Sequence, residues 1–223
     1  MMSIFDLPQS TLVNKVIPKN TFHPMASGKI KKQLTDIVSK ITWKNKLSSE
    51  TINLSGKTVD EIQIFEIELK SKSYIKDVTN VIDRNIPYTI IFLMTFEGEC
   101  YVSSSLKHNN PKDPDSAVID CEFHSDWINK NESPHRLILN NSLDDILKRF
   151  CLSLIGIDNL DKNISNEDLI KYVREKDSLE KEISTLENKI KTCKQFNQKV
   201  ELNSIKIKKI QVLDNLVLKY LRR

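Results

Sequence analysis

The last stretch of the chain, residues 157–223, contains no glycine and no proline, so no helix-breaking residue interrupts it. From Leu179 to Cys193 its apolar residues recur at alternating steps of four and three, which is the spacing of a coiled-coil seam. A single helix does not bury such a stripe by itself, so we expect this segment to pair with another helix. The expected seam consists of Leu179, Ile183, Leu186, Ile190, Cys193, Val200, Ile207 and Ile210.

Charge is distributed unevenly along this segment. Residues 165–188 hold four Lys and Arg against seven Asp and Glu, whereas residues 189–223 hold ten against two. The acidic and basic halves would face each other in an antiparallel pair, so we expect a second copy of the chain as the partner. A helix of a different subunit is the alternative. Because no glycine or proline offers a tight turn, we expect pairing between chains rather than a hairpin within one chain.

The rest of the chain is electrically balanced and apolar enough to form a core. The 223 residues are 39% hydrophobic with a net charge of +4, and the first 164 residues hold 20 Lys and Arg against 21 Asp and Glu. We therefore expect an α+β domain over residues 1–160 and a coiled-coil helical tail over residues 161–223.

Cysteine spacing and hydropathy indicate the compartment. The four cysteines form no CxxC pair, and no apolar run reaches the roughly 20 residues that span a bilayer. The first ten residues lack a basic region followed by a long apolar run, so we expect no signal peptide. These features predict a cytoplasmic protein with reduced thiols and no membrane partner.

Strand and helix signals before the tail predict one mixed sheet. Residues 61–96 read as strand, helix and strand, which implies a parallel crossover, and the later strands imply antiparallel pairing. The helix that begins at Ser27 is expected to reach Ile41, and residues 108–116 are expected to form an exposed loop. The fold class is therefore α+β, with about five strands packed with helices and followed by a long C-terminal coiled-coil helix. The strands are expected at 51–54, 61–70, 88–96, 99–106 and 117–123, and further helices begin at Ser73, Ser142 and Ser165.

Glu66, Glu68 and Lys70 form the arrangement most similar to a catalytic site. Alternate residues of a strand project to one face, as in nucleases that hold a divalent cation beside a lysine. Under this alternative the protein is a metal-dependent nuclease, and Mg²⁺ is its cofactor. We favour a plain solvated strand face, because this short pattern occurs often by chance.

No other motif predicts a cofactor or a metal site. Residues 55–58, Ser-Gly-Lys-Thr, end like a phosphate-binding loop, but Thr51 stands where that pattern needs a glycine. A strand pattern also follows where the phosphate-binding loop needs a helix, so we interpret these residues as a turn. Cys121 and His124 are three residues apart on a strand and point to opposite faces, so we expect no zinc site.

Basic residues crowd the second half of the tail. Lys206, Lys208 and Lys209 are candidate contacts to the phosphates of nucleic acid, which would give sequence-independent, salt-sensitive binding. The alternative is a solvated flank of a paired helix. We favour the flank, because few aromatic residues interleave to stack on bases.

Several segments together resemble one known family. They are IPKNTF (17–22), WKNKLS (43–48), IQIFEIELK (62–70), IPYTIIFL (86–93), FHSDW (123–127) and KQFNQKVELN (194–203). The combination resembles a prokaryotic family described as domain of unknown function 4391, over nearly the whole chain. Members of that family are often encoded beside helicases and DNA methyltransferases of restriction-like, anti-phage loci. The resemblance implies a defence setting and carries over no catalytic residues.

The expected function is that of a non-catalytic accessory subunit of such a helicase or methyltransferase system, which pairs through its C-terminal helix. The alternatives are the metal-dependent nuclease and the nucleic-acid-binding protein described above. Under the favoured hypothesis we expect no cofactor and an oligomer.

Overall fold

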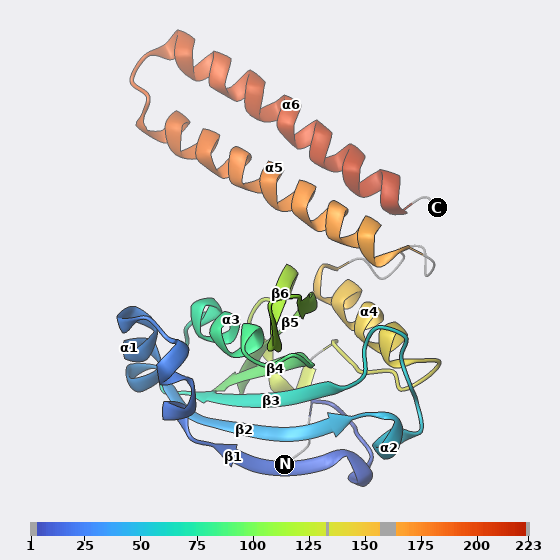
Figure 1. The fold of residues 1–223 in the computed structure, drawn as a ribbon. Coiled ribbons are helices and arrows are strands. Elements are labelled where there is room, and N and C mark those ends of the chain that lie inside the picture. Colours follow the sequence, from blue (N-terminus) through green and yellow to red (C-terminus); the bar gives the residue numbers. More distant parts are fainter. Residues whose placement is uncertain (1–3, 133, 157–163, 222–223) are drawn as a thin grey trace. The chain divides into compact units, whose positions relative to one another are not determined.

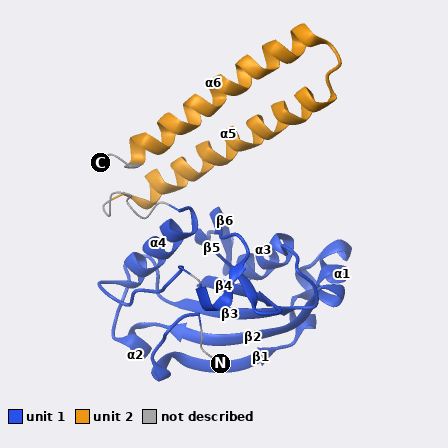
Figure 2. Cartoon of the chain, turned by 180° about the vertical axis from the view of Figure 1, so that it is seen from behind, with its two compact units in different colours: residues 1–156 blue, residues 157–223 orange. Residues whose placement is uncertain are grey.

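The computed structural model describes residues 4–132, 134–156 and 164–221. The chain forms two compact units, residues 1–156 and residues 157–223, which Figure 2 colours separately. We call them the body and the helical unit, and we describe each by itself. The predicted domain boundary at residue 160 lies outside the described residues.

The body is built on a seven-stranded mixed sheet, in which β7 pairs with β5. Figure 1 shows the order of the other strands, β1-β2-β3-β4-β5-β6. Neighbouring strands are antiparallel except for β3 and β4, which are parallel and are connected through helix α3. The predicted α+β class and parallel crossover are confirmed, whereas the predicted number of about five strands is too low. The strands are β1 (Leu12–Ile17), β2 (Val38–Leu47), β3 (Ile62–Leu69), β4 (Thr89–Phe96), β5 (Glu99–Asn110), β6 (Asp113–His124) and β7 (Ile128–Asn129).

Most helices begin where polar capping residues stand in the sequence. The Ser142 and Ser165 hydroxyls accept hydrogen bonds from the backbone N–H groups of Asp145 and Asp168, which confirms both predicted starts. The helices are α1 (Gly28–Asp36), α2 (Ser49–Ile52), α3 (Lys76–Arg84), α4 (Leu143–Leu154), α5 (Asn166–Thr192) and α6 (Phe196–Leu221), with 3-10 helices η1 (Gln9–Thr11), η2 (Lys19–Met25) and η3 (Lys130–Glu132).

The helix predicted to run from Ser27 to Ile41 is wrong in its second half. Helix α1 ends at Asp36, and β2 begins at Val38 between β1 and β3. Val38 and Ile41 are both fully buried, although residues three apart on a regular strand point to opposite faces. A register shift between Val38 and Lys40, typical of a β-bulge, brings the side chains of Val38 and Ile41 to the same buried face. The spacing of these two buried residues is therefore the same as in a helix.

Two further local predictions are wrong. The strand expected at residues 51–54 is replaced by the short helix α2, where the side chains of Ser48 and Thr51 form a capping box. The loop expected at residues 108–116 is instead the tip of a long hairpin, in which β5 and β6 stay paired as far as Asn110 and Asp113. Polar composition suggested a loop, but a solvent-exposed hairpin tip needs no apolar residues.

Helices α3 and α4 cover opposite faces of the central strands. Val78 and Ile82 of α3 belong to one buried cluster with Phe92 of β4. On the other face, α4 packs on strands β5 and β6, and its Phe150 and Cys151 are buried. In Figure 1, strands β5 and β6 stand between the two helices. Because both faces are covered, β4 is buried continuously from Thr89 to Met94, and buried and exposed residues do not alternate along it.

The Ser-Gly-Lys-Thr segment is a turn, as predicted, and it is held by α4. The Asp144 carboxylate accepts hydrogen bonds from the backbone N–H groups of Lys57 (2.5 Å) and Thr58 (3.1 Å) and from the Thr58 hydroxyl. A Cβ atom at Gly56 would collide with the backbone of Val59 and with Asp144. The glycine is therefore needed for the close approach of this turn to the first turn of α4.

The helical unit consists of two helices, so the predicted single long helix is wrong. Residues 193–195 separate α5 from α6, and ion pairs Lys209–Glu182 (2.7 Å) and Lys206–Glu187 (3.8 Å) show that the two helices run antiparallel. The prediction against an intramolecular hairpin is therefore also wrong. Cys193 ends α5 with an extended backbone (φ −69°, ψ 130°), so this reversal needs no left-handed residue and hence no glycine.

Candidate functional site

The body contains a cavity of about 300 Å³ between α3 and strands β4, β5 and β6. Its helix side is formed by Lys76, Thr79, Asn80 and Asp83, and its sheet side includes three consecutive serines of β5, residues 103–105. Serine side chains are small, so this part of β5 leaves space beneath α3. The volume lies at the lower end of the range for small-molecule sites.

A buried ion pair closes one wall of the cavity. The Lys107 ammonium donates to the Asp83 carboxylate (2.8 Å) and to the backbone carbonyls of Asp83 (2.8 Å) and Ile86 (2.7 Å). The Ser105 hydroxyl donates to the other Asp83 oxygen. Burial raises the pKa of Asp83 and lowers the pKa of Lys107, because it penalises the charged form of each group. All three ammonium donors have acceptors, so this group of residues fastens the end of α3 to β5 and is structural.

Aromatic rings form another part of the cavity. Tyr74 and Tyr101 line it with ring centroids 5.0 Å apart, and Trp127 packs on Tyr101 at 4.8 Å. The Tyr101 hydroxyl accepts a hydrogen bond from the backbone N–H of Ile75 (2.9 Å). Burial raises the pKa of Tyr101 to about 12. Its phenol is therefore a fixed neutral group at physiological pH and does not act as a base.

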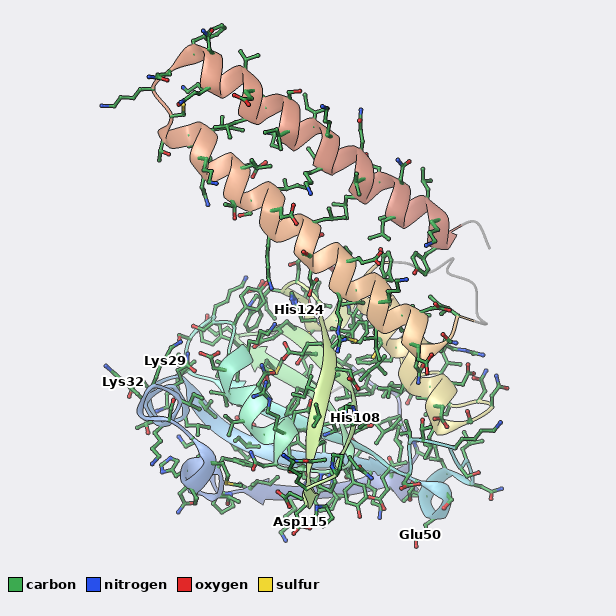
Figure 3. The ribbon with its side chains drawn as sticks, turned by 45° about the horizontal axis from the view of Figure 1, so that its top comes forward. Lys29, Lys32, Glu50, His108, Asp115 and His124 are labelled. Carbon is green, nitrogen blue, oxygen red and sulfur yellow. The ribbon has the colours of Figure 1, made fainter. Side chains whose placement is uncertain are left out.

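Acidic and neutral polar groups also line the cavity. Glu122 is paired with Lys76 at 2.5 Å, so the lysine is already neutralised. Within the described part of the chain, the side chains of Ser103, His124 and Asp126 make no hydrogen bond or ion pair. His124 lies at one end of β6, opposite the end that holds Asp115 (Figure 3). This cavity was not predicted from the sequence; the run of serines in a buried strand is the signal that could have indicated it.

The predicted nuclease residues lie on and just after β3, and each is bound by a different partner. Glu66 pairs with Lys44 and Lys130, both at 3.3 Å. Glu68 pairs with Lys40 on β2 at 3.5 Å, and the Lys70 ammonium donates to the carbonyl of Thr35 at 2.7 Å. The two carboxylates thus belong to cross-strand ion pairs, and Lys70 is directed to the end of α1.

The cysteines and the possible metal ligands of the described residues do not form a second site. No group of three or more His, Cys, Asp or Glu side chains there is arranged to hold a metal ion. Burial raises the pKa of Cys100 to about 11 and that of Cys151 well above its usual value, so neither is an activated thiol. No helix among the described residues has the length and apolar character needed to cross a bilayer.

The predicted seam residues of the tail divide between two environments. Leu179, Ile183, Leu186 and Ile190 of α5 are partly buried along one side of the helix. Helix α6 presents a different set to α5. The inner face of α6 is a row of buried or partly buried residues at steps of four and three: Lys199, Leu202, Lys206, Lys209, Leu213, Leu216 and Tyr220. Asn203 and Val217, next to this row, are also partly buried.

The predicted seam residues of α6 lie on another side of that helix. Val200, Ile207 and Ile210 are 53%, 54% and 36% exposed. Together with four further residues they repeat at steps of four and three along the whole helix. We call this set the outer seam: Phe196, Val200, Asn203, Ile207, Ile210, Asp214 and Val217. Cys193, the remaining predicted seam residue, lies in the turn between the helices.

The candidate phosphate contacts also separate in space. Lys206 and Lys209 pair with Glu187 and Glu182 of α5, whereas Lys208 is exposed. Among the described residues, Lys208 is therefore the one lysine of the three that has no acidic partner in the hairpin. The arrangement is that of a hairpin stabilised by its own charge complementarity, with no concentrated basic patch at these three positions.

Comparison with known proteins identifies the family. The family model described as "Domain of unknown function (DUF4391)" matches residues 5–213. Among the curated proteins none matches the chain, and none of the solved structures does. The match spans both units apart from the end of α6, so the chain belongs to the domain of unknown function 4391 family.

Proposed function

We propose that this protein is a non-catalytic accessory subunit that joins other protein chains through the outer seam of α6. One observation carries this proposal: α6 has two sides with coiled-coil spacing, and the hairpin uses the less apolar one. The inner face of α6 includes Lys206 and Lys209, whereas the outer seam presents Val200, Ile207 and Ile210 to solvent. A helix that is apolar on more than one side is expected to be covered on more than one side.

The energetics support an interaction role. Fully burying one large aliphatic side chain stabilises a complex by about 1.5–3 kcal/mol before the cost of association. Several such side chains in one continuous row therefore suffice for a specific contact between helices. The body supports the non-catalytic part of the proposal, because its charged groups at Glu66, Glu68, Asp83 and Lys107 are engaged in ion pairs.

The setting we propose is the one implied by the sequence resemblance. The assembly would be that of a helicase or DNA methyltransferase of a restriction-like or anti-phage system. The outer seam would join two chains within this assembly, and the body would contact another component of it.

Co-purification tests the proposal. The full chain is expressed with the proteins encoded beside its gene, and co-elution is followed by size-exclusion chromatography with light scattering. Ile207→Asp is expected to abolish assembly, because it places a charge in the outer seam. Val212→Asp is the matched control, since Val212 lies on another side of α6 and is 51% exposed against 54% for Ile207. Assembly that survives Ile207→Asp, or no assembly of any kind by the wild type, contradicts the proposal.

The cavity supports a second candidate function, binding of a small ligand. Its aromatic wall and the Asp126 carboxylate, which has no ion-pair partner among the described residues, suit a neutral or cationic ring better than an anion. Benzylamine and benzoate are matched probes, because they have the same ring and opposite charges. Chemical-shift changes with benzylamine alone, lost in Ser103→Phe, are expected. Equal responses to both probes, or a response unchanged by Ser103→Phe, contradict this function.

A further inference from the structure

We infer that the outer seam of α6 is an antiparallel interface with a second copy of this chain, in which Asn203 of each copy faces Asp214 of the other. The inference rests on the proposed role of the outer seam and names its occupant. Helix α6 is 26 residues long, and its outer seam holds five apolar residues and two polar ones. The positions of the two polar residues indicate the partner and its direction.

The outer seam is symmetric about the midpoint between Ile207 and Ile210. Asn203 lies four residues before Ile207, and Asp214 lies four residues after Ile210. Val200 and Val217 are likewise placed seven residues outside the same pair. In an antiparallel pair of α6 helices with the twofold axis at this midpoint, Ile207 therefore faces Ile210, and Val200 faces Val217. Every apolar residue between Val200 and Val217 in the outer seam meets an apolar residue of the second copy.

The polar residues complement each other in this register. The Asn203 side-chain amide is a donor of two hydrogen bonds, and the Asp214 carboxylate accepts them. A twofold axis makes the contact twice, so both interruptions of the seam are satisfied. In a parallel pair the same positions would face themselves, which would place Asp214 against Asp214 at the interface. That like-charge contact disfavours the parallel arrangement.

The surroundings of the outer seam do not oppose this pairing. The positions along one edge of it, Asn197, Ser204 and Gln211, carry no charge. Along the other edge, Lys206 is already paired with Glu187 of its own hairpin, and Lys199 is the one further lysine. Two basic helices can therefore approach without an unscreened row of lysines between them. The result is a four-helix assembly in which the α5–α6 hairpins pack through α6.

Sedimentation of the full chain with charged variants tests the register. Asn203→Lys places an ammonium against Asp214 of the second copy, so the dimer is expected to tighten roughly fivefold at low salt. Asn215→Lys has the same change of charge off the outer seam and is expected to leave the dimer unchanged. Asn203→Asp is expected to weaken it, because two carboxylates then face each other at both contacts. Weakening by Asn203→Lys, or equal effects of Asn203→Lys and Asn215→Lys, overturns the inference.

Disulfide cross-linking gives a second measurement that does not depend on affinity. In a Cys193→Ser background, Val200→Cys chains mixed with Val217→Cys chains are expected to cross-link, whereas neither chain does so alone. Cross-linking of Val200→Cys chains with each other would show a parallel pair and overturn the inference.

Failure of the inference is distinguishable from failure of the proposed function. The full chain could be monomeric by itself and still assemble with neighbouring proteins in a way that depends on Ile207. This result overturns the pairing with a second copy and preserves the accessory role. A chain that dimerises without sensitivity to any outer-seam variant overturns the inference. It also removes the observation on which the accessory role rests.

Discussion

The central strands of the body and helix α6 are both rich in apolar residues, but they differ in how completely the chain covers them. Strand β4 is buried from Thr89 to Met94 because α3 and α4 occupy both faces of its sheet. Helix α6 has one packed side, and Val200 and Ile207 remain more than half exposed. The difference indicates that the body buries its own apolar residues, whereas the helical unit leaves an apolar side of α6 for another surface to cover.

The largest effect is expected inside the body. Asp83→Ala leaves the Lys107 ammonium buried without its carboxylate, which should lower the free energy of unfolding by about 3–5 kcal/mol. The two side chains are 5% and 3% exposed, so solvent does not compensate. Urea unfolding measures the change, and Asp77→Ala, at a partly exposed position of the same helix, is the control. Equal effects of the two substitutions would refute the structural role assigned to the pair.

A pair of leucines compares the inner face of α6 with an exposed position of the same helix. Leu216 is 9% exposed and Leu218 is 42% exposed. Leu216→Ala should destabilise the hairpin by about 2–3 kcal/mol, and Leu218→Ala by less than about 1 kcal/mol, because only the first leaves a cavity. Amide hydrogen exchange within α6, at a protein concentration below that of any association, reports the difference. Similar exchange in both variants would mean that α6 does not pack on α5 through its inner face.

A smaller effect is expected where the turn at residues 55–58 meets α4. Burial opposes ionisation of Asp144, but hydrogen bonds from the Thr58 hydroxyl and from the backbone N–H groups of Lys57 and Thr58 outweigh it, so its pKa lies below the ordinary 3.8. Asp144→Asn should cost about 1 kcal/mol at pH 7, since partial exposure screens the contact.

The pH dependence of this contact has a definite sign. A lowered pKa in the folded state means that the stabilisation is present above pH 3.8 and is lost as the pH falls through the folded pKa. The wild type and Asp144→Asn should therefore differ at pH 7 and converge in acid. A difference in unfolding free energy that is constant down to pH 2 would contradict this assignment.

The smallest effect is expected at the predicted nuclease residues. Glu68 is 45% exposed and pairs with Lys40 at 3.5 Å, so Glu68→Gln should change the free energy of unfolding by no more than about 0.5 kcal/mol. Neither the wild type nor this variant is expected to cleave DNA or RNA with Mg²⁺ or Mn²⁺. Cleavage by the wild type that Glu68→Gln abolishes would establish the nuclease alternative in place of the accessory role.

Elements marked by strong local signals were predictable. Strands β3 and β4 and the starts of α4 and α5 follow from apolar runs and from the capping serines Ser142 and Ser165. Strand β2 was missed because the register shift after Val38 gives its buried residues a helical spacing. The cavity was not predicted because it depends on tertiary structure. The strands beside the serines of β5, and the distance of α3 from these serines, cannot be inferred from the spacing of residues along the chain.

The sequence by itself determined that the C-terminal segment is helical, that its apolar residues recur at coiled-coil spacing, and that its acidic half precedes its basic half. Only the tertiary structure decided that the two halves belong to one hairpin and which side of α6 is packed. Two sides of α6 have the same periodicity, so spacing does not distinguish them. The ion pairs of Lys206 and Lys209 with α5 select the side that carries these lysines, because charge complementarity and a short connection act together there. The more apolar side is thereby left for another surface.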